Sequence, residues 1–145
     1  MIFSAAEAAA GLFIFRPSVM SVHRIRLHGP WQIRPHDAHV SPGRLTIPGS
    51  LRDGGFTDFA GRISLHRLFG RPTNLEAHEQ VWLAFDEVRG LESIALNGVQ
   101  LHMQSERLEF EVTGLLQERN EIEVALTCED DQSGIVGNVL LEIRS

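Results

Sequence analysis

The segment Ser93-Ile94-Ala95-Leu96-Asn97-Gly98-Val99-Gln100-Leu101-His102-Met103 decides the fold class of this 145-residue chain. Two runs of strand-forming residues are joined by Asn97-Gly98. A type I′ turn needs positive φ at both central residues, and Asn and Gly tolerate that conformation best. The segment therefore predicts a β-hairpin.

Alternating apolar and polar residues continue on both sides of this hairpin. At 80–85, Val81, Leu83 and Phe85 share one face, and 108–112 and 121–127 alternate in the same way. Short strands bounded by turn signals at this spacing are typical of a sandwich, so the sequence predicts a single all-β jelly-roll β-sandwich of about eight to nine strands. The other predicted strands are 23–27, 31–33, 44–47, 62–69 and 135–143, with a helical turn at 113–116.

Composition excludes several classes of protein. Apolar residues make up 43% of the chain, which excludes a disordered chain, and the 13 Gly and 6 Pro follow no collagen-like period. The 13 Lys and Arg against 19 Asp and Glu give a net charge of −6, which argues against nucleic acid as a partner. No apolar run reaches the roughly 18 residues of a membrane span.

The beginning of the chain has a helix-favouring composition, whereas the rest has strand-like alternation of apolar and polar residues. We therefore expect an N-terminal extension at 1–22 and a β-sandwich domain at 23–145. Ala and Glu in 4–15 favour a short helix there; alternatively, translation starts at Met20 rather than Met1. No basic residue precedes the apolar run, unlike in a signal peptide. Cys128 is the only cysteine, so no intramolecular disulfide forms. This favours a cytoplasmic location, although the sequence does not decide the compartment.

Landmarks along residues 24–144 resemble a known family. The chain is similar to the N-terminal sugar-binding domain of glycoside hydrolase family 2, a jelly-roll sandwich of the galactose-binding-like superfamily. The motifs that carry the resemblance, in chain order, are Gly29-Pro30-Trp31, Leu45-Thr46-Ile47-Pro48-Gly49-Ser50, Ile63-Ser64-Leu65-His66, Leu83-Ala84-Phe85-Asp86, Ile94-Ala95-Leu96-Asn97-Gly98, Asn120-Glu121-Ile122 and Ser133-Gly134-Ile135-Val136-Gly137-Asn138-Val139.

The chain departs from the family pattern at three places. Leu65-His66 stands where family members usually carry an aromatic pair, and 103–106 lacks the usual Gly-aromatic segment. The catalytic barrel with its two glutamates needs roughly 250 residues and does not fit in 145. We therefore expect no enzymatic activity from this chain alone.

The resemblance implies that two loops reach toward a sugar. They are the loop after the Ile-Pro-Gly strand and the loop before the last strand. Both loops carry carboxylates or a planar guanidinium, and these groups suit the neighbouring hydroxyl groups of a sugar. These candidate ligand-binding residues are Ser50, Arg52, Asp53, Asp130, Asp131 and Gln132.

Trp82 is the remaining candidate for sugar contact. Its outward position beside Gln80 and Ala84 favours a stacking platform for a sugar ring; alternatively, Trp82 is covered by the N-terminal segment or by a partner chain. Trp31 and Cys128 are expected in the core.

No metal or cofactor is predicted. The closest His pair, His36 and His39, lies in a Pro-bounded loop and lacks further ligands at zinc spacing. Glu109 and Glu111 are spaced like the paired carboxylates of glycoside hydrolysis, but they are expected on the solvent-facing side of their strand. Two functions remain open: a non-catalytic module that binds carbohydrate, or a structural or interaction domain that associates with itself or with a partner protein.

Overall fold

The computed structural model describes residues 22–36, 42–103 and 106–145. Most of the predicted extension, including the helix expected at 4–15, lies outside the described residues. The strands are β1 (Val22–Arg26), β2 (Gly29–Pro35), β3 (Gly43–Ile47), β4 (Gly49–Ser50), β5 (Gly61–Gly70), β6 (Gln80–Phe85), β7 (Val88–Arg89), β8 (Leu91–Leu96), β9 (Val99–Gln100), β10 (Leu108–Glu111), β11 (Arg119–Cys128), β12 (Gly134–Ile135) and β13 (Val139–Arg144).

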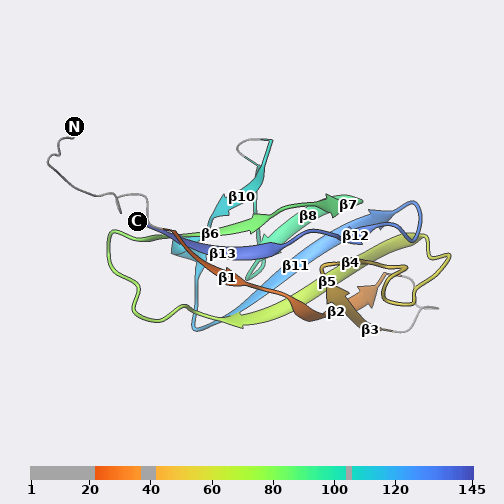
Figure 1. Ribbon diagram of the computed structural model, residues 1–145, viewed down its shortest axis with the longest axis horizontal. Coiled ribbons are helices and arrows are strands. Elements are labelled where there is room, and N and C mark those ends of the chain that lie inside the picture. The colour runs from red at the N-terminus through yellow and green to blue at the C-terminus, as the bar shows by residue number, and fades with distance from the viewer. Residues whose placement is uncertain (1–21, 37–41, 104–105) are drawn as a thin grey trace, which may run out of the picture.

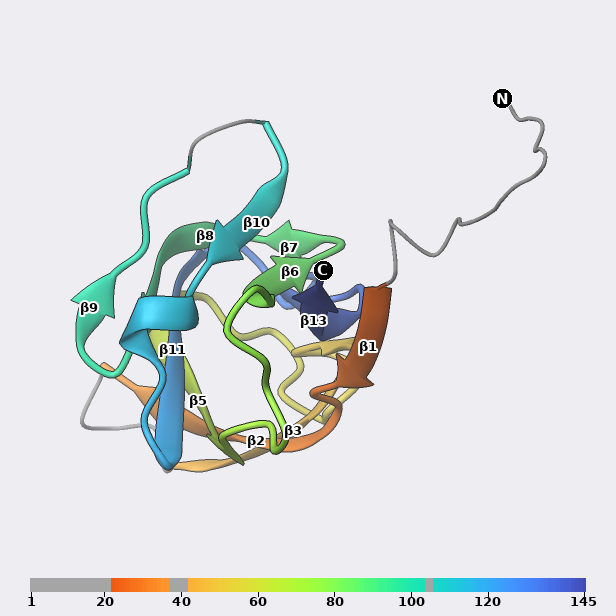
Figure 2. The ribbon, with the colours of Figure 1, turned by 90° about the vertical axis from the view of Figure 1, so that its left-hand side faces the viewer.

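Two antiparallel sheets face each other and confirm the predicted β-sandwich (Figure 1). One sheet has six strands in the order β3-β2-β5-β11-β8-β9, and the other has four in the order β1-β13-β6-β10. Seen from the end in Figure 2, the six-stranded sheet curves around one side of β6 and β13. The short strands β4, β12 and β7 form a third sheet at one end.

The core lies between the sheets, where alternate residues of the long strands point inward. β11 contributes Ile122, Val124 and Leu126, and β6 contributes Val81 and Leu83, all of which are inaccessible to solvent. Trp31 is also fully buried, as predicted, and its Nε1 donates to the carbonyl oxygen of Leu27 at 3.0 Å. Burial of alternate positions leaves the other positions of each strand on the outer faces.

The Asn97-Gly98 hairpin is confirmed. Asn97 and Gly98 have φ values of 52° and 82°, and Leu96 pairs with Val99 across the turn. The helical turn expected at 113–116 is a 3₁₀ turn at Thr113–Leu115. Strand β6 has the bounds predicted from its alternation.

The last predicted strand, 135–143, is divided in two. Gly137 interrupts it, because the backbone amides of Val136 and Gly137 both donate to the carbonyl oxygen of Glu87 at 3.1 Å. A Cβ at Gly137 would lie only 2.8 Å from the Asp86 side chain and the Glu87 backbone, so the turn needs glycine. Two-residue strands such as β12 and β7 raise the strand count above the predicted eight to nine.

None of the described residues forms a helix with the length and apolar character needed to cross a membrane.

Candidate functional site

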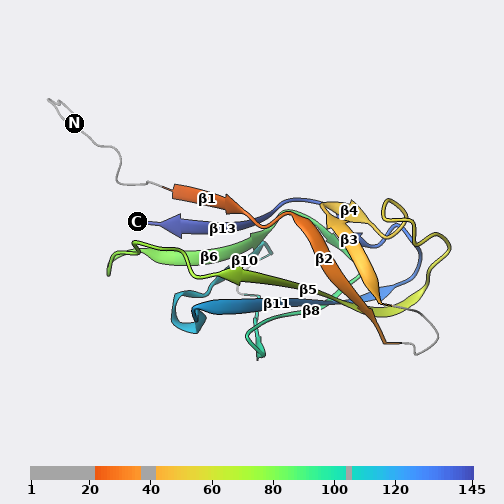
Figure 3. The same cartoon turned by 90° about the horizontal axis from the view of Figure 1, so that it is seen from below.

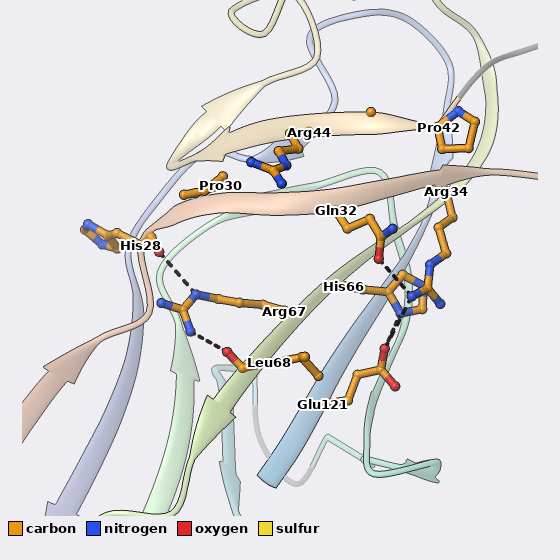
Figure 4. A pocket seen from close by; sticks show the side chains of 11 residues that line it. His28, Pro30, Gln32, Arg34, Pro42, Arg44, His66, Arg67, Leu68 and Glu121 are labelled. Atoms are coloured by element: carbon orange, nitrogen blue, oxygen red, sulfur yellow. Dashed lines mark hydrogen bonds and ion pairs between the residues drawn. The ribbon is translucent and has the colours of Figure 1, made fainter.

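A hollow of about 780 Å³ lies on the outer face of the six-stranded sheet. We call it the sheet hollow, and its polar lining consists of His28, Gln32, Arg34, Arg44, His66, Arg67 and Glu121 (Figure 4). Gln32 pairs with Arg44 of β3 on one side and with His66 of β5 on the other, so these three side chains form one row across three strands. Strand alternation directs this row to the outer face because Trp31, Ile33 and Leu65 point into the core.

The hollow exists because β2 separates from β5. The two strands pair from Pro35 and Ile63 as far as Gln32 and His66, after which β2 pairs with β3 alone. Figure 3 shows β2 and β3 running at a steep angle to β5 beyond this point. Pro30, in the separated part, has no amide hydrogen to offer a neighbouring strand.

Arg67 spans the gap that the separation leaves. Its Nε donates to the carbonyl oxygen of His28 at 3.1 Å and its Nη1 donates to that of Leu68 at 2.8 Å (Figure 4). Burial lowers the pKa of this guanidinium, which nevertheless stays charged because arginine loses its proton only far above neutral pH. Arg67 therefore places a fixed positive charge at one end of the hollow.

At the other end of the hollow, His66, Glu121 and Arg34 point toward one another. His66 is 9% exposed, and its Nδ1 lies 3.1 Å from Glu121 Oε2, while its Nε2 lies 3.8 Å from Glu123 Oε2. Arg34 Nη2 donates to Gln32 Oε1 at 2.8 Å and lies 3.7 Å from Glu121 Oε2. These contacts hold planar polar groups in fixed positions on a rigid sheet, as a binding site requires.

The structure brings the two predicted loops together, away from the sheet hollow. Arg52 Nη1 lies 3.5 Å from Asp131 Oδ2, and the Arg52 amide donates to the Asp131 carbonyl oxygen at 2.8 Å. Asp131 is buried, and its Oδ2 also accepts the amide of Asp58 at 3.0 Å, so this carboxylate ties the two loops to each other.

The other residues of these loops contact their own chain segments. Asp53 Oδ2 accepts the amide of Ser50 at 3.0 Å, which lowers the pKa of the Asp53 carboxyl, and Asp130 Oδ1 accepts the amide of Gln132 at 2.9 Å. Asp130 and Gln132 are exposed, whereas Ser50 is buried. None of the six predicted loop residues lines the sheet hollow, so sugar contact by these loops stays a prediction.

Trp82 lies on the outer face of the four-stranded sheet, on the opposite side of the sandwich from the sheet hollow. The guanidinium of Arg144 stacks over its ring at 4.3 Å from the centroid, and Trp82 Nε1 donates to Gln80 Oε1 at 3.2 Å. Arg144 in turn pairs with Glu142 and Glu109. The outward orientation predicted for Trp82 is present, with one ring face covered by Arg144; its contact with a sugar stays a prediction.

Cys128 is buried, as expected from its position in the strand pattern. Burial raises the pKa of its thiol, and the hydrogen bond from Ser133 offsets only part of this increase. A thiol of this kind is a weak nucleophile at neutral pH. Within the described ranges, no three His, Cys, Asp or Glu side chains are arranged to hold a metal ion.

Sequence reasoning missed the sheet hollow. The signal was present in the outward positions of three separate strands, where Gln32, Arg34, His66 and Glu121 occupy the places opposite to core residues. Alternation predicts that each of them faces outward, but only the strand order and register place them beside one another. His66 stands at the position where the resembled family usually has an aromatic residue, which was the one visible hint.

No family model matches this sequence, and no curated protein matches it. Solved structures do match. A β-glucuronidase from Bifidobacterium dentium, complexed with coumarin-3-O-glucuronide, has a TM-score of 0.70 at 19% identity, over 86% of this chain and 30% of its own. A β-D-mannosidase from Dictyoglomus thermophilum has 0.66 at 18%, over 82% and 22%. A β-glucuronidase from glycoside hydrolase family 2 has 0.64 at 17%, over 84% and 18%.

These comparisons define the class of fold. The chain has the β-sandwich fold of a segment of these enzymes, one of which belongs to glycoside hydrolase family 2, and this confirms at the level of fold the resemblance seen in the sequence. It spans less than a third of the length of each of these three enzymes.

Proposed function

We propose that this chain is a non-catalytic module that binds carbohydrate in the sheet hollow. The observation that carries the proposal is the row of planar polar side chains set on rigid strands around one concavity. A volume of about 780 Å³ lies within the range of small-molecule sites. Amide, guanidinium, imidazole and carboxylate groups pair well with the adjacent hydroxyl groups of a sugar ring.

The lining also supplies an apolar surface for the C–H groups of a sugar. Pro30 and Pro42 line the hollow, and Leu68, which also lines it, is 56% exposed. A site that combines a few fixed polar groups with apolar contacts provides both orientation and affinity. The similarity of the fold to domains of sugar-processing enzymes supports the same proposal.

The test is a glycan array with the full chain, followed by thermal shift and calorimetry on each hit. Binding to the folded state alone raises the melting temperature, as the proposal expects. The double variant Gln32→Ala/Arg34→Ala changes two exposed side chains of β2 and should weaken binding at least tenfold. Arg26→Ala, an exposed arginine on the four-stranded sheet, is the matched control and should bind normally.

A third variant separates the sheet hollow from the predicted loops. Arg52→Ala removes an exposed guanidinium from the loop residues and should leave binding unchanged if the sugar lies in the hollow. Loss of binding with Arg52→Ala but not with Gln32→Ala/Arg34→Ala would move the site to Ser50, Arg52, Asp53 and 130–132. An array without hits would contradict the proposal.

The alternative is an interaction domain, which associates with itself or with a partner protein. Among the described residues, the exposed large hydrophobic side chains are Val22, Leu68, Val99 and Met103, of which only Val99 and Met103 are near one another in sequence. An interface would normally gather such side chains in one patch. A silent array together with a dimer in light scattering would favour this alternative.

A further inference from the structure

The charge of the sheet hollow is opposite to that of the whole chain. Arg34, Arg44 and Arg67 line it, with Glu121 as the one carboxylate in the described lining. The full chain has a net charge of −6. A local excess of fixed positive charge in a concave surface favours a ligand of negative charge.

The three arginines differ in how many of their side-chain N–H donors already bond to the protein. Arg67 donates to the carbonyl oxygens of His28 and Leu68, so its role is to hold the gap open and to supply charge. The side chain of Arg44, in contrast, makes no hydrogen bond or ion pair with any residue that the structure describes, although its backbone belongs to the β2–β3 pair. Its five N–H donors are therefore available to a ligand.

Arg34 donates one hydrogen bond, from Nη2 to Gln32 Oε1 at 2.8 Å, but its ion pair with Glu121 is weak. Its side chain is 49% exposed, and its distance of 3.7 Å from Glu121 Oε2 is that of a solvent-screened pair, which contributes little stability. Glu121 has a closer partner in His66 Nδ1, at 3.1 Å. A ligand anion can therefore take the place of Glu121 beside Arg34 at small cost.

Strand geometry allows Arg34 and Arg44 to reach the same group. Gln32 lies directly opposite Arg44, and Arg34 is two residues along the same strand, on the same face. Neighbouring strands are about 5 Å apart and residues i and i+2 about 7 Å apart. Figure 4 shows the Arg34 guanidinium beside His66 and the Arg44 guanidinium nearer Pro30, so an anion bound by both would lie between these two parts of the hollow.

We infer that the ligand of the sheet hollow is an anionic sugar, whose carboxylate or sulfate group lies between Arg44 and Arg34. This inference rests on the proposed carbohydrate-binding function. Both anions present oxygen atoms that guanidinium groups bind through charge-assisted hydrogen bonds. The sugar ring would then lie over Pro30 and Leu68, which line the same hollow.

The test compares charged and uncharged forms of the same oligosaccharide by calorimetry with the full chain. The probes are oligogalacturonides with their methyl esters, and sulfated galactan oligosaccharides with their desulfated forms. We expect one charged form to bind at least tenfold more tightly than its uncharged partner, and this preference to shrink as salt rises from 50 to 500 mM. The pair that shows the preference identifies carboxylate or sulfate.

Three variants locate the effect. Arg44→Gln should remove the preference for the charged form, so that the charged and uncharged forms bind with affinities within threefold of each other. Glu121→Gln should change the preference in the opposite direction, because it removes the anion that competes for Arg34. Arg26→Gln, on the other sheet, should leave both affinities unchanged.

The outcomes separate this inference from the proposed function. Equal or tighter binding of neutral glycans, on the array or in calorimetry, would overturn the anionic ligand and leave carbohydrate binding intact. Absence of binding to neutral, uronic and sulfated glycans alike would overturn both. A preference that persists in Arg44→Gln would also contradict the site assigned here.

Discussion

At the scale of single residues, the same physical rule gives different roles to the two tryptophans. Trp31 is fully buried and donates a hydrogen bond to Leu27 in the core. Trp82 faces outward in the same kind of strand, where Arg144 stacks on its ring. The period-two pattern predicted both orientations. It could not predict that Arg144 covers the ring of Trp82, because Arg144 belongs to a strand about 60 residues later in the sequence.

We expect Trp82→Ala to lower the free energy of unfolding by about 1–2 kcal/mol, because it removes a partly exposed cation–π contact and a modest apolar area. Sugar binding in the sheet hollow should be unchanged, since Trp82 lies on the opposite face. Urea unfolding and calorimetry measure the two effects. Loss of binding with unchanged stability would instead make Trp82 a sugar platform.

Glu142 couples stability to pH. Burial by itself would raise the pKa of this carboxyl, but hydrogen bonds from Arg144 at 2.6 Å and Arg24 at 3.0 Å outweigh it, so the pKa is lower than its ordinary 4.5. The unfolded chain therefore binds a proton more readily than the folded chain. The stabilisation from Glu142 is present above the ordinary pKa and is lost as pH falls through the lowered value.

The corresponding test is urea unfolding of Glu142→Gln between pH 3 and pH 7. The variant should be less stable than the parent chain at pH 7, because the charge-assisted hydrogen bonds are weakened. The difference should shrink as the pH falls below 4.5, the ordinary pKa of the group. A difference that stays constant with pH would show that these contacts do not depend on the charge of Glu142.

At the scale of elements, a buried asparagine fixes the hairpin turn against β11. Asn120 Oδ1 accepts hydrogen bonds from Asn97 Nδ2 at 3.0 Å and from the amide of Gln117 at 2.8 Å. Asn97 Oδ1 accepts the amide of Glu121 at 2.9 Å. The Asn97-Gly98 turn is thus readable from the sequence, but its attachment to the start of β11 is a tertiary contact that no local pattern shows.

Asn120→Ala should lower the free energy of unfolding by about 3 kcal/mol, because it leaves buried partners unsatisfied. The neighbouring exposed Arg119→Ala is a matched control, expected within about 0.5 kcal/mol of the parent chain. Urea denaturation followed by circular dichroism gives both values. Equal stability of the two variants would mean that the Asn120 contacts contribute nothing net.

At the scale of the whole molecule, the first and last strands close the sandwich. Val22 pairs with Arg144, and β13 lies between β1 and β6 in the four-stranded sheet. The sequence predicted the strands of both sheets from alternation and turn residues. It did not predict their order or register, and for this reason the sheet hollow, formed by β2, β3, β5 and β11, could not be found from the sequence.

Because one core joins the two sheets, we expect them to unfold in a single transition. The variant Trp82→Phe leaves Trp31 as the only tryptophan, so its fluorescence reports the core beside β2. Its urea midpoint should coincide with that of far-ultraviolet circular dichroism, which reports both sheets. Two separate midpoints would show that the sheets unfold independently.

The early departure of β2 makes β5 an interior strand along one half and an edge strand along the other. Open strand edges can recruit strands of other chains, and natural proteins commonly protect them with charged side chains. Here Arg67 occupies the opening and bonds the Leu68 carbonyl oxygen that a foreign strand would use. We therefore expect Arg67, which lines the sheet hollow, also to protect the protein against aggregation, and Arg67→Val should lower its solubility.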